Sequence, residues 1–118
     1  MSFALFFAMT KPLLRFGIHN FLNASPLLLP LKEQGVDMGF QVITDTPAVL
    51  ADRLKSSDLD LAMIPSVEYF KSADSYRLVP GVCIASRGEV GTVLFLTKKP
   101  INEIRSIAAD NRSRTSVA

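Results

Sequence analysis

The sequence contains very little of what metal centres and covalent cross-links are built from. Its 118 residues include one cysteine, one histidine and no tryptophan. A single cysteine excludes a disulfide or a cysteine-based zinc site within the chain, and we expect no metal centre. Cys83 lies inside the apolar run 82–85, and free cysteines in such runs are commonly buried and inert, so we predict a core position for it.

Strong charge and long apolar runs are missing too. The net charge is +2, and the densest basic cluster is the pair Lys98–Lys99, so we expect no nucleic-acid partner. No uninterrupted apolar run reaches the roughly 18 residues of a membrane helix, so we expect no membrane partner. Residues 1–9 resemble a weak secretion signal, but Lys11 and Arg15 follow the apolar stretch instead of preceding it. We therefore treat residues 1–12 as a leader of uncertain status and expect a cytoplasmic protein.

What the sequence does contain is a regular alternation of apolar runs and helix-forming segments. The apolar runs predict strands, or at least extended chain, at residues 13–18, 38–43, 61–64, 76–79, 81–85, 90–97 and 106–109. Hydroxyl and proline residues at helix starts predict helices at residues 25–34, 46–54 and 65–70. Gly35 is expected to end the first helix and Pro30 to kink it. This alternation is typical of an α/β protein with a mostly parallel sheet and crossover helices.

No standard catalytic motif is present, because the chain lacks a glycine-rich phosphate loop, a nucleophile elbow and metal-ligand spacing. Polar helix starts do recur, at residues 23–25, 65–66 and 113–116. In an open α/β sheet such starts gather at the carboxyl ends of the strands, and their free N–H groups favour anions. A single one is most often only a helix cap, but together they favour a site for a small carboxylate ligand. The chain stops at Ala118, just inside the last predicted helix, so we expect a truncated sequence.

Four ordered segments resemble the chorismate dehydratase family of the futalosine route to menaquinone: residues 16–27, 58–69, 79–88 and 113–117. The resemblance implies the two-lobed fold (type II) of periplasmic binding proteins, here incomplete. Residues 13–90 would form part of the first lobe, and residues 91–118 the crossover strand and the start of the second. It also implies a carbon–oxygen lyase that removes water from chorismate, a dicarboxylate, to give 3-enolpyruvyl-benzoate without a cofactor.

Matching positions in these segments imply the roles of individual residues. Asn23 and Thr92 would be catalytic and face the substrate. The residues that would bind its carboxylate or hydroxyl oxygens are Ser66, Ser113, Arg114, Thr115 and Ser116. The base stays open between His19, Glu68 and the enolpyruvyl carboxylate of the substrate itself, and we favour the last.

Three other interpretations remain open. The chain could belong to a solute-binding protein for a small carboxylate, or to the sister enzyme that acts on the dehypoxanthinyl futalosine intermediate. It could also be a non-functional gene fragment. Under the dehydratase interpretation we expect the isolated 118-residue chain to be inactive, because the family's cleft needs a second lobe. The oligomeric state is left open.

Overall fold

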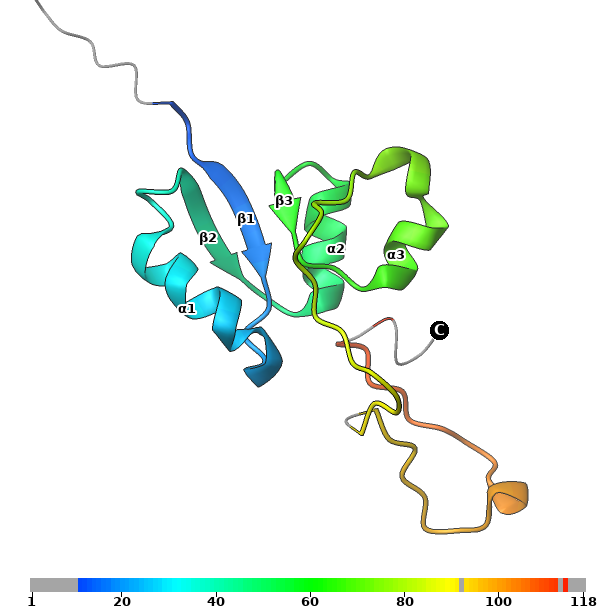
Figure 1. The fold of residues 1–118 in the computed structure, drawn as a ribbon. Helices are drawn as coiled ribbons and strands as arrows, with labels where there is room; N and C mark the ends of the chain where they lie inside the picture. The colour runs from blue at the N-terminus through cyan, green and yellow to red at the C-terminus, as the bar shows by residue number, and fades with distance from the viewer. Residues whose placement is uncertain (1–10, 92, 113, 115–118) are drawn as a thin grey trace, which may run out of the picture.

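The computed structural model describes residues 11–91, 93–112 and 114 (Figure 1). A parallel three-stranded sheet lies at its centre, in the order β2-β1-β3. Its strands are β1 (Leu14–Ile18), β2 (Phe40–Thr44) and β3 (Leu61–Ala62). The helices are α1 (Ser25–Gln34), α2 (Pro47–Lys55) and α3 (Ser66–Lys71), with single 3₁₀ turns at η1 (Leu22–Ala24), η2 (Ala73–Ser75) and η3 (Ile101–Glu103). The predicted α/β class and parallel sheet are confirmed.

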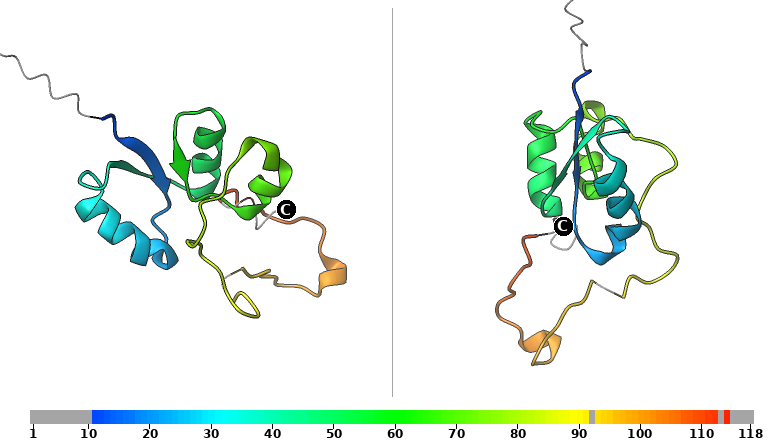
Figure 2. Two further views of the ribbon diagram at one scale, coloured as in Figure 1. Left: turned by 45° about the horizontal axis from the view of Figure 1, so that its top comes forward. Right: turned by 90° about the vertical axis from the view of Figure 1, so that its left-hand side faces the viewer.

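The connections between the strands place helices on both faces of the sheet. The chain runs from β1 through α1 to β2 on one side, and then through α2 past β1 to β3 on the other. Parallel crossovers of this kind are right-handed. The crossover from β2 to β3 runs across the sheet in the opposite direction to the crossover from β1 to β2, so its helix α2 lies on the opposite face from α1. Figure 2 shows α1 and α2 on opposite sides of β1.

The core is correspondingly small and divided between the two faces. On the α1 face, Ile18, Ala24 and Leu28 are buried together. On the α2 face, Leu50 and Leu59 lie against Gly17 of β1 so closely that a Cβ at Gly17 would be 2.8 Å from Leu50 Cδ2 and 2.5 Å from Leu59 Cδ1. The absence of a side chain at Gly17 therefore lets α2 approach the sheet.

The predicted helix boundaries are confirmed to within a residue or two, but the capping details differ. α1 begins at Ser25 itself, because η1 leads directly into it, and no side chain caps either α1 or α2. Pro26 lies in the first turn of α1 as predicted. Gly35 caps the end of α1 as predicted, and Pro30 lies inside the helix.

Beyond η2 the strands predicted at residues 90–97 and 106–109 are wrong among the described residues. Among the described residues of 76–112 there is no strand, and the chain instead makes a long excursion away from the sheet and back, turning at η3 (Figures 1 and 2). A strand needs a neighbour to pair its backbone N–H and C=O groups, and the described residues of the excursion form no such ladder with another segment. The apolar side chains here are exposed, and Leu96 keeps 85% of its accessible surface. Cys83 is exposed as well, so its predicted core position is also wrong.

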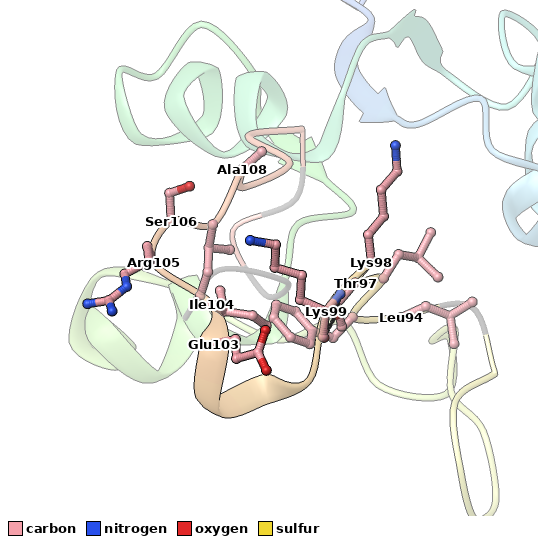
Figure 3. Close-up of a pocket in the computed structure, with 12 residues that line it drawn as sticks. Leu94, Thr97, Lys98, Lys99, Glu103, Ile104, Arg105, Ser106 and Ala108 are labelled. Carbon is pink, nitrogen blue, oxygen red and sulfur yellow. Dashed lines mark hydrogen bonds between the residues drawn. The ribbon is translucent and has the colours of Figure 1, made fainter.

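The excursion has two limbs, one before and one after η3, and they enclose an open hollow of about 550 Å³ (Figure 3). It is lined by residues 94–99 and 103–108, with Lys98, Lys99, Glu103 and Arg105 among them. The hollow lies away from the sheet, and of the described residues predicted to bind a ligand, neither Asn23, Ser66 nor Arg114 lines it.

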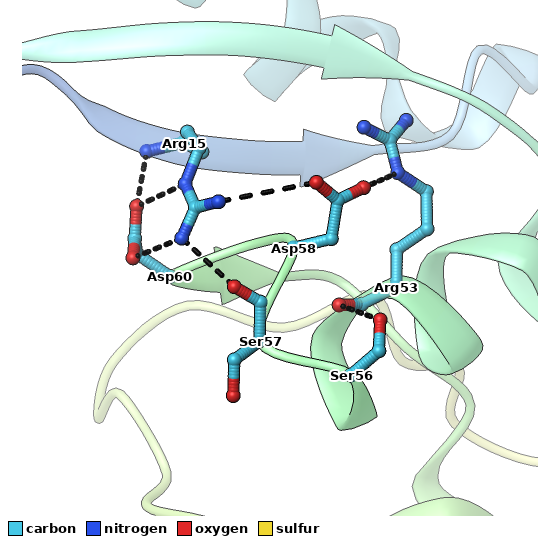
Figure 4. Close-up of polar contacts among 6 residues, drawn as sticks. All are labelled: Arg15, Arg53, Ser56, Ser57, Asp58 and Asp60. Carbon is cyan, nitrogen blue, oxygen red and sulfur yellow. Dashed lines mark hydrogen bonds and ion pairs between the residues drawn. The ribbon is translucent and has the colours of Figure 1, made fainter.

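An ionic network joins the amino end of β1 to the loop before β3 (Figure 4). Arg15 donates from its backbone N and its Nε to Asp60 Oδ2, at 2.8 and 3.0 Å, and from Nη2 to Asp60 Oδ1 at 2.9 Å. Arg53 of α2 pairs with Asp58 in the same loop at 2.6 Å. The hydrogen bonds from Arg15 lower the pKa of Asp60 to about 2. This network fixes β3 beside β1.

Candidate functional site

The sheet order identifies one edge as the place where a ligand would bind. From β1 the chain leaves towards β2, whereas β3 lies on the other side of β1. The strand order therefore reverses between the neighbouring strands β1 and β3. In open parallel sheets, the crevice at the carboxyl ends of two strands at such a reversal is the usual ligand site. The loops that follow β1 and β3 therefore form the candidate site, and we call this region the switch edge.

Asn23 and Ser66 both lie at the switch edge, in loops that follow neighbouring strands. Asn23 is exposed in the middle of η1, and this turn is anchored by Ala24, which is fully buried and whose N–H bonds to the Phe21 carbonyl at 2.9 Å. Ser66 is exposed at the first position of α3. Two hydrogen-bonding side chains on rigid supports are thus available to solvent at this edge.

His19 follows β1 directly and is nearly buried, with 9% of its surface exposed. Its ring centre lies 4.9 Å from that of Phe21, and its Nδ1 has no hydrogen-bond partner among the described residues. Burial lowers the pKa of His19 below the ordinary value of 6.5. The imidazole is therefore neutral at neutral pH, and its buried Nδ1 is not exposed to a ligand.

This burial makes the stability of the fold depend on pH. Below about pH 6.5 the unfolded chain binds a proton that the folded His19 resists, so the free energy of unfolding is expected to fall as the pH drops from 7 to 5. The chain has no other histidine, so an NMR titration of the imidazole is unambiguous. We expect a midpoint below 6.5 and a flatter pH profile of stability for His19→Asn. A midpoint at or above 6.5 would contradict the burial argument.

The end of the excursion returns to the switch edge and contacts α2 and α3. Arg114 Nη2 lies 2.7 Å from Asp52 Oδ1 and 2.8 Å from Oδ2, and Arg114 Nη1 lies 3.3 Å from Glu68 Oε2. The Ala48 N–H donates to the Arg112 carbonyl at 3.3 Å. The hydrogen bonds that Arg114 donates to Asp52 and Glu68 raise the pKa of Arg114 above its ordinary value. We call Ala48, Asp52, Glu68, Arg112 and Arg114 the return clamp.

The clamp contains two residues for which the sequence predicted other roles, Glu68 and Arg114, and three that it did not single out. Arg114 was expected to pair with a substrate carboxylate, but in the structure it contacts two protein carboxylates. Glu68 was a candidate base, and its side chain is 13% exposed and paired with Arg114. Asp52 is 62 positions from Arg114, and nothing in the sequence signals this pairing. Thr92, Ser113, Thr115 and Ser116 lie outside the described residues.

Among residues 11–91, 93–112 and 114, no three His, Cys, Asp or Glu side chains gather in a way that could hold a metal ion. No helix within the same residues is long and apolar enough to cross a membrane.

Comparison with known proteins agrees with the resemblance seen in the sequence. Residues 14–118 match the sequence model of a family described as menaquinone biosynthesis. Chorismate dehydratase from Thermus thermophilus is 31% identical over 102 residues, which are 86% of this chain and 36% of that protein. The chain thus spans about a third of the length of this relative. It belongs to the menaquinone biosynthesis family.

Proposed function

We propose that this chain is part of a chorismate dehydratase, a carbon–oxygen lyase of the futalosine route with a periplasmic-binding-protein-like fold. The observation that carries the proposal is the pair Asn23 and Ser66, which follow neighbouring strands at the switch edge, in a chain 31% identical to a chorismate dehydratase over 102 residues. In this proposal residues 13–90 belong to the first lobe and residues 91–118 lead into the second. The reaction belongs to the whole protein.

The reaction removes water from the ring of chorismate. A ring C–H bond breaks and gives up its proton, the ring C–O bond breaks, the hydroxyl leaves as water, and the ring becomes aromatic. Aromatisation supplies much of the driving force, so the protein mainly has to orient the substrate. We assign Asn23 and Thr92 to donating hydrogen bonds where negative charge develops, and Ser66, Ser113, Thr115 and Ser116 to binding the oxygens of the substrate.

The base in this proposal is the enolpyruvyl carboxylate of the substrate. Two features of the switch edge support that assignment. His19 is nearly buried and its Nδ1 is covered, and the carboxylate of Glu68 is engaged by Arg114. A base must come within about 3 Å of the proton that it removes, and this requirement disfavours both the covered Nδ1 of His19 and the Arg114-paired carboxylate of Glu68.

The proposal is tested on the native protein purified from its source, after its intact mass has been measured. Loss of chorismate is followed by ultraviolet absorbance against a blank without protein, and the product is identified by mass. We expect 3-enolpyruvyl-benzoate to accumulate. Binding of chorismate without turnover would instead indicate a solute-binding protein, and turnover of dehypoxanthinyl futalosine would indicate the sister enzyme. Either result would refute the proposed reaction.

A further inference from the structure

We propose that Arg114 is a positioning residue, which holds the returning chain at the switch edge and does not itself bind the substrate. This inference rests on the proposed function, because it concerns how the substrate site is assembled. It reassigns Arg114, which the sequence suggested as the charge partner of a substrate carboxylate. The return clamp supplies three independent observations in its support.

The first observation is the charge around the Arg114 guanidinium. Asp52 takes both hydrogen bonds from Nη2, and Glu68 lies within ion-pair distance of Nη1. One cation between two carboxylates leaves this cluster with a net negative charge. A substrate carboxylate arriving at Arg114 would be repelled by Asp52 and Glu68 and would have to displace one of them. The cluster is therefore built to satisfy the arginine within the protein.

The second observation is the burial of Glu68. Its side chain is only 13% exposed, although it lies in the first turn of a short helix. A carboxylate with so little access to water is costly unless a cation or a hydrogen-bond donor accompanies it. Arg114 is the cation that faces Glu68, so loss of the guanidinium would leave this carboxylate largely desolvated without its partner.

The third observation is how the clamp meets α2. Ala48 is the second residue of this helix, where backbone N–H groups have no partner within the helix, and the Thr46 side chain does not cap it. The Arg112 carbonyl accepts the Ala48 N–H instead. Asp52 is four residues further along and so lies on the same face of α2 as Ala48. One face of α2 thus holds both the backbone and the side chain of the returning segment.

The consequence concerns the motif to which Arg114 belongs. Residues 113–116 are the group that we assign to binding substrate oxygens, and Arg114 is covalently part of it. The clamp fixes Arg114 beside the middle of α2 and the first turn of α3. Breaking it is therefore expected to lower kcat/KM without removing any group that touches the substrate. Misplacing a binding element by as little as about 1 Å can cost up to roughly a hundredfold in rate.

The test compares two ways of breaking the clamp in the native protein. Arg114→Gln removes the guanidinium, whereas the double variant Asp52→Asn, Glu68→Gln keeps it and neutralises its partners. We expect both to lower kcat/KM for chorismate about tenfold, with the triple variant no worse than either, because all three break one coupled unit. Arg105→Gln removes the same charge from an exposed position on the excursion and is the matched control, expected to stay within about twofold of wild type.

A direct role for Arg114 gives a different pattern. If the guanidinium binds substrate, the double variant frees it and keeps or improves kcat/KM, while Arg114→Gln alone loses activity; that result would overturn the proposal. Unchanged kcat/KM in all variants, with only the melting temperature lowered, would overturn it as well. Arg114→Lys keeps the charge and guards against a glutamine variant that does not fold; we expect it to restore part of the lost activity.

Amide hydrogen exchange of the native protein keeps this test separate from the proposed reaction. We expect the Ala48 amide to exchange several-fold faster in both clamp variants and at the wild-type rate in Arg105→Gln. Unchanged exchange at Ala48 would refute the clamp itself. Absence of chorismate turnover by the wild-type protein would refute the proposed function and leave the exchange result standing.

Discussion

Replacing Asn23 by alanine is expected to lower kcat/KM for chorismate by about a hundredfold or more, with little change in stability. If Asn23 donates a hydrogen bond to charge that develops in the transition state, the loss falls mainly on kcat. Removal of one such donor typically lowers kcat by about 10²–10³-fold. The side chain is exposed in η1, and the turn is held by the buried Ala24 and not by the amide. The measurement is steady-state kinetics of the native protein, alongside its melting temperature.

Two further variants make this prediction specific. Asn23→Asp has nearly the same shape but cannot donate from an NH₂ group, so we expect it to be almost as impaired as Asn23→Ala. Asn20→Ala removes an exposed amide from the loop that follows the same strand and is the matched control, expected to stay within about twofold of wild type. Equal losses at Asn20 and Asn23 would indicate a general disturbance of the loop, and full activity of Asn23→Ala would remove it from the mechanism.

The elements of the sheet and its helices were predictable because their signals are local. Each strand is a short apolar run, and each helix begins with a proline or hydroxyl and ends near a glycine or serine. The same local reading failed for the excursion, where residues 90–97 have strong β propensity. Strand formation depends on a partner that supplies backbone hydrogen bonds, and propensity alone cannot provide one. The exposure of Cys83 has the same origin, since the whole run 82–85 that contains it is exposed.

The candidate site was predictable only in part, for a related reason. Asn23 and Ser66 could be found because parallel strands bring the ends of consecutive βα units to one edge. The return clamp could not, because Asp52 and Arg114 are far apart in sequence and each alone has the appearance of an ordinary surface charge. Arg114 was singled out as a cation near the site, but its partners are visible only once the chain has turned back at η3. Its role as a positioning residue therefore emerges from the fold.

Leu50→Ala is expected to lower the free energy of unfolding by about 2–5 kcal/mol, the cost of emptying a well-packed leucine site. Leu50 is fully buried and packs where Gly17 lets α2 approach β1, so neighbouring atoms have little freedom to fill the space. That loss is a large share of the roughly 5–15 kcal/mol that stabilises a typical domain. Chemical denaturation followed by far-ultraviolet circular dichroism measures it.

The control is the adjacent residue on the same helix. Val49 is 39% exposed, so Val49→Ala is expected to cost less than about 1 kcal/mol. Equal costs at the two positions would mean that α2 does not pack on the sheet through Leu50. The same helix carries Ala48 and Asp52 of the return clamp, so loosening its inner face should also speed amide exchange at Ala48. The switch edge then depends on the packing of α2 against β1, as well as on the polar groups that face the ligand.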